Sequence, residues 1–155
     1  MVKRQPGFTL VEVLVALVVM TVGMLGIAAL YVEGLRMSRT SIYRMNAVNL
    51  AADMAERIRT NPSVPADYAG NGPGAENDCV NGVNACTEQE LAEDDWWRWR
   101  AAMTENMPPD TAGDIAVNDA INGTDQYDIT VTWPETGAAA PISYTLVVVV
   151  HPANE

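Results

Sequence analysis

One long apolar segment near the N-terminus constrains this chain more than any other feature. Twenty residues from Val13 to Val32 carry no charge, and Glu12 is the only charged residue between Phe8 and Val32. A helix over residues 8–32 would be about 37 Å long, which exceeds the hydrocarbon core of a bilayer, about 30 Å thick. A secretory signal has a shorter apolar region, about 7–15 residues, and no carboxylate near its start. The segment therefore predicts a single membrane-spanning helix.

The segment is preceded by a short basic stretch. Residues 1–7, Met-Val-Lys-Arg-Gln-Pro-Gly, end in proline and glycine, which both disfavour a helix. Lys3 and Arg4 favour a cytoplasmic N-terminus, whereas three arginines just beyond the span argue weakly for the opposite orientation. The charges alone leave the orientation open.

The two cysteines decide between these orientations. Cys79 and Cys86 lie in a loop rich in glycine and asparagine, and an even cysteine count in an exported domain favours a disulfide. Two free thiols are the alternative. Closing so small a ring would stabilise the fold by about 2.5 kcal/mol in the chain-entropy model. We therefore expect a single-pass protein with its N-terminus inside and residues 61–155 forming an exported globular domain.

Helical periodicity continues beyond the apolar segment. No proline appears between Phe8 and Pro62, and apolar residues recur at spacings of three and four. The pattern predicts one helix over residues 8–59. Its first half, to residue 32, would lie in lipid, and its second half, residues 33–60, would pack on the soluble domain. The stripe expected to face that domain comprises Ile42, Met45, Val48, Ala52, Ala55 and Ile58.

A second, shorter helix follows a loop over residues 61–86. Thr87 and Glu90 form a capping box that predicts a helix running to about Asn106, with Asp94 able to pair with Arg98. Trp97 lies off the apolar stripe of this helix. It is the candidate for contact with a partner protein, and a tryptophan lying flat on its own domain is an equal alternative. The stripe itself predicts core packing rather than a ligand site and comprises Ala92, Trp96, Trp99, Met103 and Met107.

The C-terminal part alternates in the manner of antiparallel strands. Residues 127–133 and 142–150 predict two strands, and residues 113–118 predict a weaker third. Both faces of the last strand become apolar from Leu146 to Val150, so this end is expected to be central in the sheet or covered by a neighbouring subunit. The expected fold class is α+β, with a long N-terminal helix packed on a small antiparallel sheet and an extra short helix.

Charge and missing chemistry exclude several functions. The formal net charge is −11, and it would be −13 without residues 1–7, so binding of nucleic acid by general electrostatics is not expected. His151 is the only histidine and has no partners spaced for a catalytic triad or a metal site. The spacing of Asp119, Asn122 and Asp125 does not fit a calcium-binding loop, so we expect a solvated turn there. We expect that the chain is not an enzyme and that it binds no metal and no other cofactor.

The sequence Gly-Phe-Thr-Leu-Val-Glu, from Gly7 to Glu12, combines a small residue, an aromatic residue and a carboxylate at the head of the apolar helix. It resembles the class III signal of type IV prepilins and type II secretion pseudopilins. The resemblance implies cleavage after Gly7 by a prepilin peptidase, N-methylation of Phe8 and use of Glu12 in filament assembly. It also implies a protein of the bacterial inner membrane, with a periplasmic domain, that later enters a filament.

Three further segments resemble those of the PilV-like minor pilins, also called type IV pilus modification proteins. They are residues 13–17, 23–29 and 51–62. The cysteine pair, the tryptophan-rich helix and the strand at 127–133 are similar more loosely. This resemblance implies the type IV pilin fold and a minor pilin that, with other minor pilins, a tip protein and the major pilin, initiates a pilus used in twitching motility.

Other functions remain open at this point. A minor pseudopilin of a type II secretion system would have the same fold but would belong to a secretion apparatus instead of a pilus. A third hypothesis is an adhesin or a DNA-uptake pilin. The net negative charge of the chain argues against DNA uptake.

Overall fold

The protein was analysed in a computed structural model of the whole chain. The structure describes residues 7–80, 82, 85–119 and 124–151. Residues 1–6, which form most of the expected leader, lie outside the described residues, as do Asn122 and Gly123 of the expected solvated turn.

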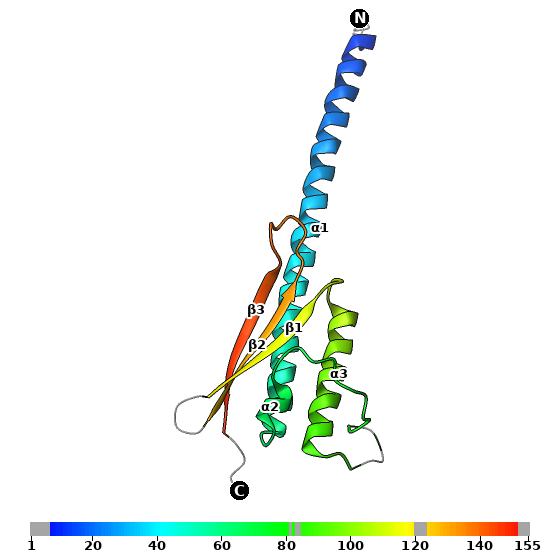
Figure 1. Cartoon of the computed structure of the whole chain (residues 1–155). Coiled ribbons are helices and arrows are strands. Elements are labelled where there is room, and N and C mark those ends of the chain that lie inside the picture. The colour runs from blue at the N-terminus through cyan, green and yellow to red at the C-terminus, as the bar shows by residue number, and fades with distance from the viewer. Residues whose placement is uncertain (1–6, 81, 83–84, 120–123, 152–155) are drawn as a thin grey trace, which may run out of the picture. The chain divides into compact units, whose positions relative to one another are not determined.

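Three helices precede three strands. The chain divides into two compact units, Met1–Thr40 and Ser41–Glu155, and helix α1 contributes to both. The elements are α1 (Leu10–Thr60), α2 (Pro65–Tyr68), α3 (Glu88–Asn106), β1 (Ala112–Asp119), β2 (Asp125–Trp133) and β3 (Ile142–Val150) (Figure 1).

The first unit contains the apolar part of α1. Every large apolar side chain from Phe8 to Leu35 keeps at least half of its surface exposed. Among the described residues, α1 is the one helix long and apolar enough to cross a membrane, with a mean hydropathy of 2.7 in its most apolar window. So much exposed apolar surface is unfavourable in water and favourable in lipid. These properties fit anchoring in the inner membrane.

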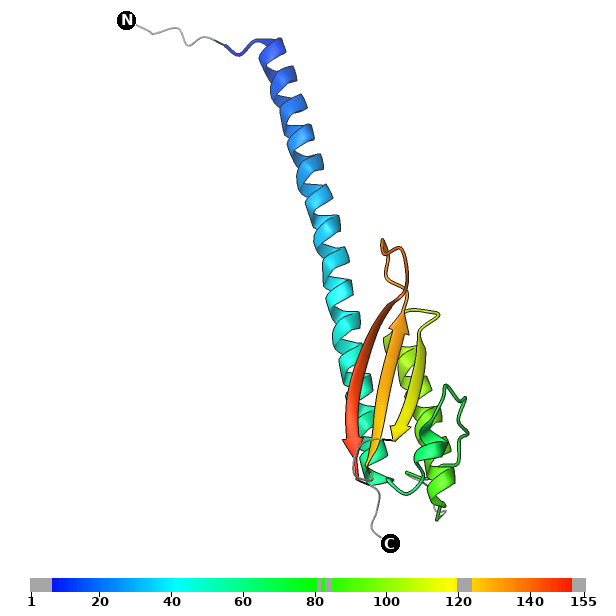
Figure 2. The ribbon, with the colours of Figure 1, turned by 60° about the vertical axis from the view of Figure 1, so that its left-hand side comes forward.

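In the second unit, a three-stranded antiparallel sheet packs on two helices. The strand order is β1-β2-β3, and Ile129 at the centre of β2 pairs with Ile115 of β1 and Leu146 of β3. The second half of α1 and helix α3 cover one face of this sheet (Figures 1 and 2). The expected α+β fold, with a long helix on a small antiparallel sheet, is therefore confirmed. The alternating buried residues of β2 are those expected: Tyr127, Ile129, Val131 and Trp133.

Helix α3 forms as predicted and buries the expected stripe. The capping box is present, with Thr87 accepting from the backbone of Glu90 and the Glu90 side chain accepting from the backbone of Thr87. Trp99 is fully buried, and its Nε1 donates to the carbonyl of Leu50 at 2.8 Å. Its ring lies directly against Gly113 of β1, where any side chain would collide with the indole. A glycine on β1 therefore permits the close approach of α3 to the sheet.

The stripe expected on the second half of α1 is wrong over most of its length. Ile42, Met45 and Val48 are exposed, by 53%, 67% and 42%. Apolar residues occur on more than one side of this part of the helix, so spacings of three and four fit two different stripes. The face with more alanine packs inward because small side chains let the neighbouring elements approach closely. The buried residues are Ala47, Leu50, Ala51, Met54, Ala55 and Ile58.

The segment expected as a loop between the helices contains more structure than predicted. Pro65 begins the single-turn helix α2, and the buried Tyr68 ends it. Gly70, with a φ of 100°, then exchanges two backbone hydrogen bonds with Ile115, at 2.7 and 2.8 Å. This bridge covers the outer edge of β1. It could not be predicted because it pairs one isolated residue with a strand far along the chain.

The position of β3 corrects one of the two expectations for residues 146–150. The strand lies at the edge of the sheet, so the central position is wrong. Val148 and Val150 are buried on the inner face, whereas Val147 and Val149 remain exposed on the outer face. Coverage by a neighbouring subunit stays a prediction.

Candidate functional site

The start of α1 brings together the residues that the sequence singled out for processing and assembly. Gly7 and Phe8 precede the helix and are exposed. Thr9 then caps the helix, which begins two residues later than expected. The backbone N and Oγ1 of Thr9 lie 3.1 and 3.0 Å from Oε2 of Glu12, and the Glu12 backbone N lies 3.4 Å from Thr9 Oγ1.

This geometry is a second capping box, which the sequence analysis did not identify although Thr and Glu are three residues apart. It fixes the Glu12 carboxylate in the first turn, where it complements the positive end of the helix dipole. Glu12 is therefore held close to Phe8 by a local interaction, before any other subunit is present.

The cysteine loop has a buried anchor in addition to its disulfide. Cys79 and Cys86 are bonded in the structure, as the sequence led us to expect. The fully buried Asp94 accepts hydrogen bonds at Oδ1 from the backbone N of Asn77 and of Asp78, at 3.0 and 3.1 Å. Its Oδ2 accepts from Nε of Arg98 at 2.6 Å. The pair with Arg98 was predicted, and the two backbone bonds were not.

Removing the disulfide is expected to lower the free energy of unfolding by about 2–3 kcal/mol, because the unfolded chain regains the entropy of the small ring. Cys79→Ser and Cys86→Ser should have the same effect as the double variant, since either one breaks the bond. Denaturant unfolding of the full chain in detergent, followed by tryptophan fluorescence, measures this. Equal stability of oxidised wild type and the double variant would contradict a stabilising role.

The buried Asp94 should make the fold sensitive to acid. Burial alone raises the pKa of a carboxyl, but the bonds from Arg98 and the loop amides outweigh it and hold the pKa of Asp94 below its ordinary value. A depressed pKa in the folded state contributes stability above the ordinary value, about 4, and that contribution is lost as the pH falls through the folded value. Asp94→Asn should therefore flatten the decline of unfolding free energy below about pH 4. Asp114→Asn, which removes an exposed carboxylate of β1, is the control for the loss of one negative charge.

A second buried carboxylate joins three helices. Asp95 is 4% exposed; its Oδ1 accepts from Arg57 at 2.9 Å and its Oδ2 accepts from the hydroxyl of Tyr68 at 2.8 Å. The Nδ2 of Asn61 donates to the Tyr68 oxygen at 3.2 Å and to the carbonyl of Glu88 at 2.8 Å. Burial, reinforced by Asp95, raises the pKa of Tyr68, so its hydroxyl stays a donor. The network ties the end of α1 to α2 and to the start of α3.

Trp97 differs from the other tryptophans in its exposure. It is 36% exposed, whereas Trp96, Trp99 and Trp133 are at most 2% exposed. The loop at Gly74 lies directly against the same turn of α3. The approach is so close that a side chain at position 74 would collide with the backbone of Trp97. Part of the indole surface is thus open, and contact with a partner stays a prediction.

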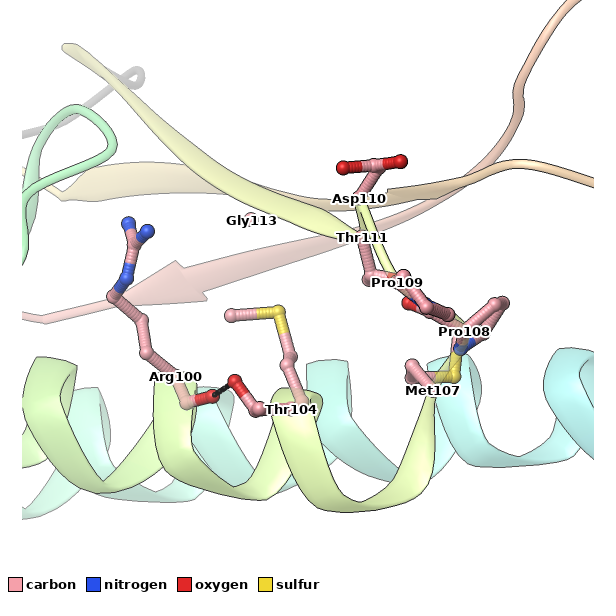
Figure 3. Close-up of a pocket in the computed structure, with 9 residues that line it drawn as sticks. Arg100, Thr104, Met107, Pro108, Pro109, Asp110, Thr111 and Gly113 are labelled. Carbon is pink, nitrogen blue, oxygen red and sulfur yellow. Dashed lines mark hydrogen bonds between the residues drawn. The ribbon is translucent and has the colours of Figure 1, made fainter.

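A hollow of the second unit, beside the end of α3, offers little to a ligand. It has a volume of about 260 Å³, below the roughly 300–1,000 Å³ of typical ligand pockets. Figure 3 shows Arg100 and Thr104 of α3 on one side and the turn with Asp110 on the other. Arg100 is already engaged, since its Nη1 donates to the carbonyls of Asn71 and Gly72. Among the described residues, no group of three or more His, Cys, Asp or Glu side chains is placed to hold a metal ion.

Comparison with known families matches two consecutive parts of the chain. Residues 2–28 match the prokaryotic N-terminal methylation motif, and residues 29–97 match the Tt1218-like family, described as type IV pilin Tt1218. Searches of curated proteins and of solved structures gave no significant match. The chain thus carries an N-terminal methylation motif followed by a segment similar to the Tt1218-like type IV pilins.

Proposed function

We propose that this protein is a minor pilin, which helps to initiate a type IV pilus and remains in the priming complex at its tip. The observation that carries the proposal is the methylation motif over residues 2–28 at the head of an exposed apolar helix, directly followed by the pilin-like segment. Pilins are structural subunits, and the described residues of the second unit form a packed core. The acidic, disulfide-containing domain fits a protein that contacts other subunits outside the cytoplasm.

The proposal assigns a role to each part of the chain. Residues 1–7 form a leader that a prepilin peptidase removes, and residues 8–32 cross the inner membrane with the N-terminus in the cytoplasm. Residues 33–60 form the soluble half of the helix, and residues 61–155 form the periplasmic domain. The partners are other minor pilins, a tip protein and the major pilin, with Trp97 as one contact.

We expect the mature chain to begin at a methylated Phe8. The bond between Gly7 and Phe8 precedes the capped helix, and glycine lets the backbone enter a protease cleft without a side-chain clash. Intact-mass analysis of membrane-extracted protein measures both changes. Retention of Met1 in a strain with an active prepilin peptidase would contradict the proposal.

A minor pseudopilin of a type II secretion system is the second function consistent with the same motif and fold. A deletion strain separates the two. Loss of piliation and twitching with normal secretion, together with detection of the protein in sheared pili by mass spectrometry, supports the pilus. Normal piliation with failed secretion supports the pseudopilin. Complementation by the wild-type chain controls for effects on neighbouring genes.

A further inference from the structure

The two edges of the sheet are treated differently by the fold. Gly70 pairs with Ile115 in the middle of the outer edge of β1. At the opposite edge lies β3, and the described residues contain no backbone pairing beyond it (Figure 1). An edge strand presents N–H and C=O groups that another extended chain can use. The β1 edge is therefore paired at one residue, whereas the β3 edge is open along its described length.

The β3 strand lacks the features that normally protect an edge. Its nine residues, Ile142–Val150, include no charge and no proline, and its pairing with β2 runs without a bulge from Ile142 to Val150. Val147 and Val149 add apolar surface on the outer face, with exposed fractions of 55% and 53%. Such a strand pairs readily with another chain, so in the working protein we expect it to be covered.

The charge around this strand selects the kind of partner. Asp125 and Asp128 of β2 pair with Val150 and Val147 of β3, and the sequence contains no Lys or Arg after Arg100. Glu135, between β2 and β3, already contacts Arg44 of α1 at 3.6 Å. On the outer face, Val147 lies directly beside Asp128 of β2, which in turn lies beside Ala116 of β1. A second copy of the chain would bring the same carboxylates to this edge, and like charges placed together are unfavourable. A basic segment would instead be attracted to it.

We propose that the open edge of β3 binds an extended basic segment of a different protein by strand addition. The backbone of that segment continues the sheet beyond β3, and its apolar side chains cover Val147 and Val149. Its Lys or Arg side chains extend over the valines towards Asp128, since long basic side chains can bury their stems and keep their charge near a carboxylate. The inference concerns the sheet alone and holds whether the filament is a pilus or a pseudopilus.

The test measures binding of a labelled octapeptide of alternating lysine and valine to the full chain in detergent. We expect saturable binding at low salt, together with slower hydrogen exchange of the backbone amides in residues 142–150. The same peptide with the backbone nitrogens of two adjacent central residues methylated keeps every side chain and every charge, but loses a donor to the edge in either register. It should bind roughly tenfold more weakly or worse. An octapeptide of alternating glutamate and valine should not bind.

Two matched variants of the protein separate strand addition from general attraction. Val147→Lys places a like charge at the edge and should weaken peptide binding roughly tenfold or more. Ala112→Lys adds the same charge to the outer face of β1, two strands away and beside Thr132 rather than Asp128, and should weaken it much less. Both positions are exposed on the outer face, and circular dichroism checks that both variants fold.

Four results would overturn the proposal. The first is no saturable binding up to roughly 1 mM peptide, and the second is equal binding of the N-methylated peptide. The third is equal weakening by Val147→Lys and Ala112→Lys, which would mean that only net charge matters. Self-association of the wild-type chain in sedimentation, abolished by Val147→Lys, would show instead that a second copy occupies the edge.

Discussion

Replacing Glu12 with alanine is expected to abolish entry of the protein into filaments while leaving membrane insertion and cleavage after Gly7 intact. A carboxylate at mid-bilayer costs about 2.5–3.5 kcal/mol if charged, and somewhat less near the end of the span, so it needs a compensating partner. Removal of residues 1–7 creates one, the new amine of Phe8, on a neighbouring subunit or on the same chain. Loss of an interaction of that size changes an equilibrium roughly a hundredfold, which would be visible as absence from sheared filaments.

The capping box gives this experiment a sharper control. Glu12 also accepts hydrogen bonds from Thr9, so Glu12→Ala removes a helix cap as well as a charge. Thr9→Val removes the hydroxyl of the cap and keeps the carboxylate. If Glu12 acts in assembly, Thr9→Val should still enter filaments. Equal loss in both variants would assign the effect to capping of α1, and normal piliation by Glu12→Ala in a strain lacking the native copy would leave the carboxylate without an assembly role.

Local signals in the sequence predicted the elements of this fold well. The capping box at Thr87 and Glu90 fixed the start of α3, and strict alternation from Tyr127 to Trp133 identified β2. Both signals depend on residues close together in the chain. For the same reason Asp94 and Arg98, one helical turn apart, could be paired in advance.

Features that depend on distant residues were missed or assigned wrongly. The face of α1 that packs inward is decided by Trp99 and the sheet, so periodicity alone favoured Ile42 and Met45, which are exposed. The edge position of β3 follows from the order of the strands in the sheet, and the apolar residues from Leu146 to Val150 do not predict that order. The Asp95 network was missed because Arg57, Tyr68 and Asp95 come from three separate elements. The motif from Gly7 to Glu12 was identified because its residues are close together in the chain. Its contacts in a filament depend on other subunits, so the sequence of one chain does not predict them.

Replacing Asp95 with alanine is expected to cost the second unit about 3–5 kcal/mol of unfolding free energy. The substitution leaves the Arg57 guanidinium without its buried partner and the Tyr68 hydroxyl without its acceptor. Denaturant unfolding of the full chain in detergent, followed by fluorescence, measures the change. The buried Trp96 and Trp99 are close along α3 and report on this unit directly.

Arg57 supplies its own matched control, because the same guanidinium contacts two carboxylates at the same distance. Its Nε lies 2.9 Å from Asp53 and its Nη1 lies 2.9 Å from Asp95, but the Asp53 side chain is 48% exposed and that of Asp95 is 5% exposed. Exposed ion pairs contribute about 0.2–1 kcal/mol, so Asp53→Ala should cost several-fold less than Asp95→Ala. Asp95→Asn should lie between them, since the amide oxygen still accepts one bond while the charge is lost. Equal costs for Asp53→Ala and Asp95→Ala would mean that burial does not set the strength of this network, and that the bonds of Asp95 do not decide how α1, α2 and α3 are joined.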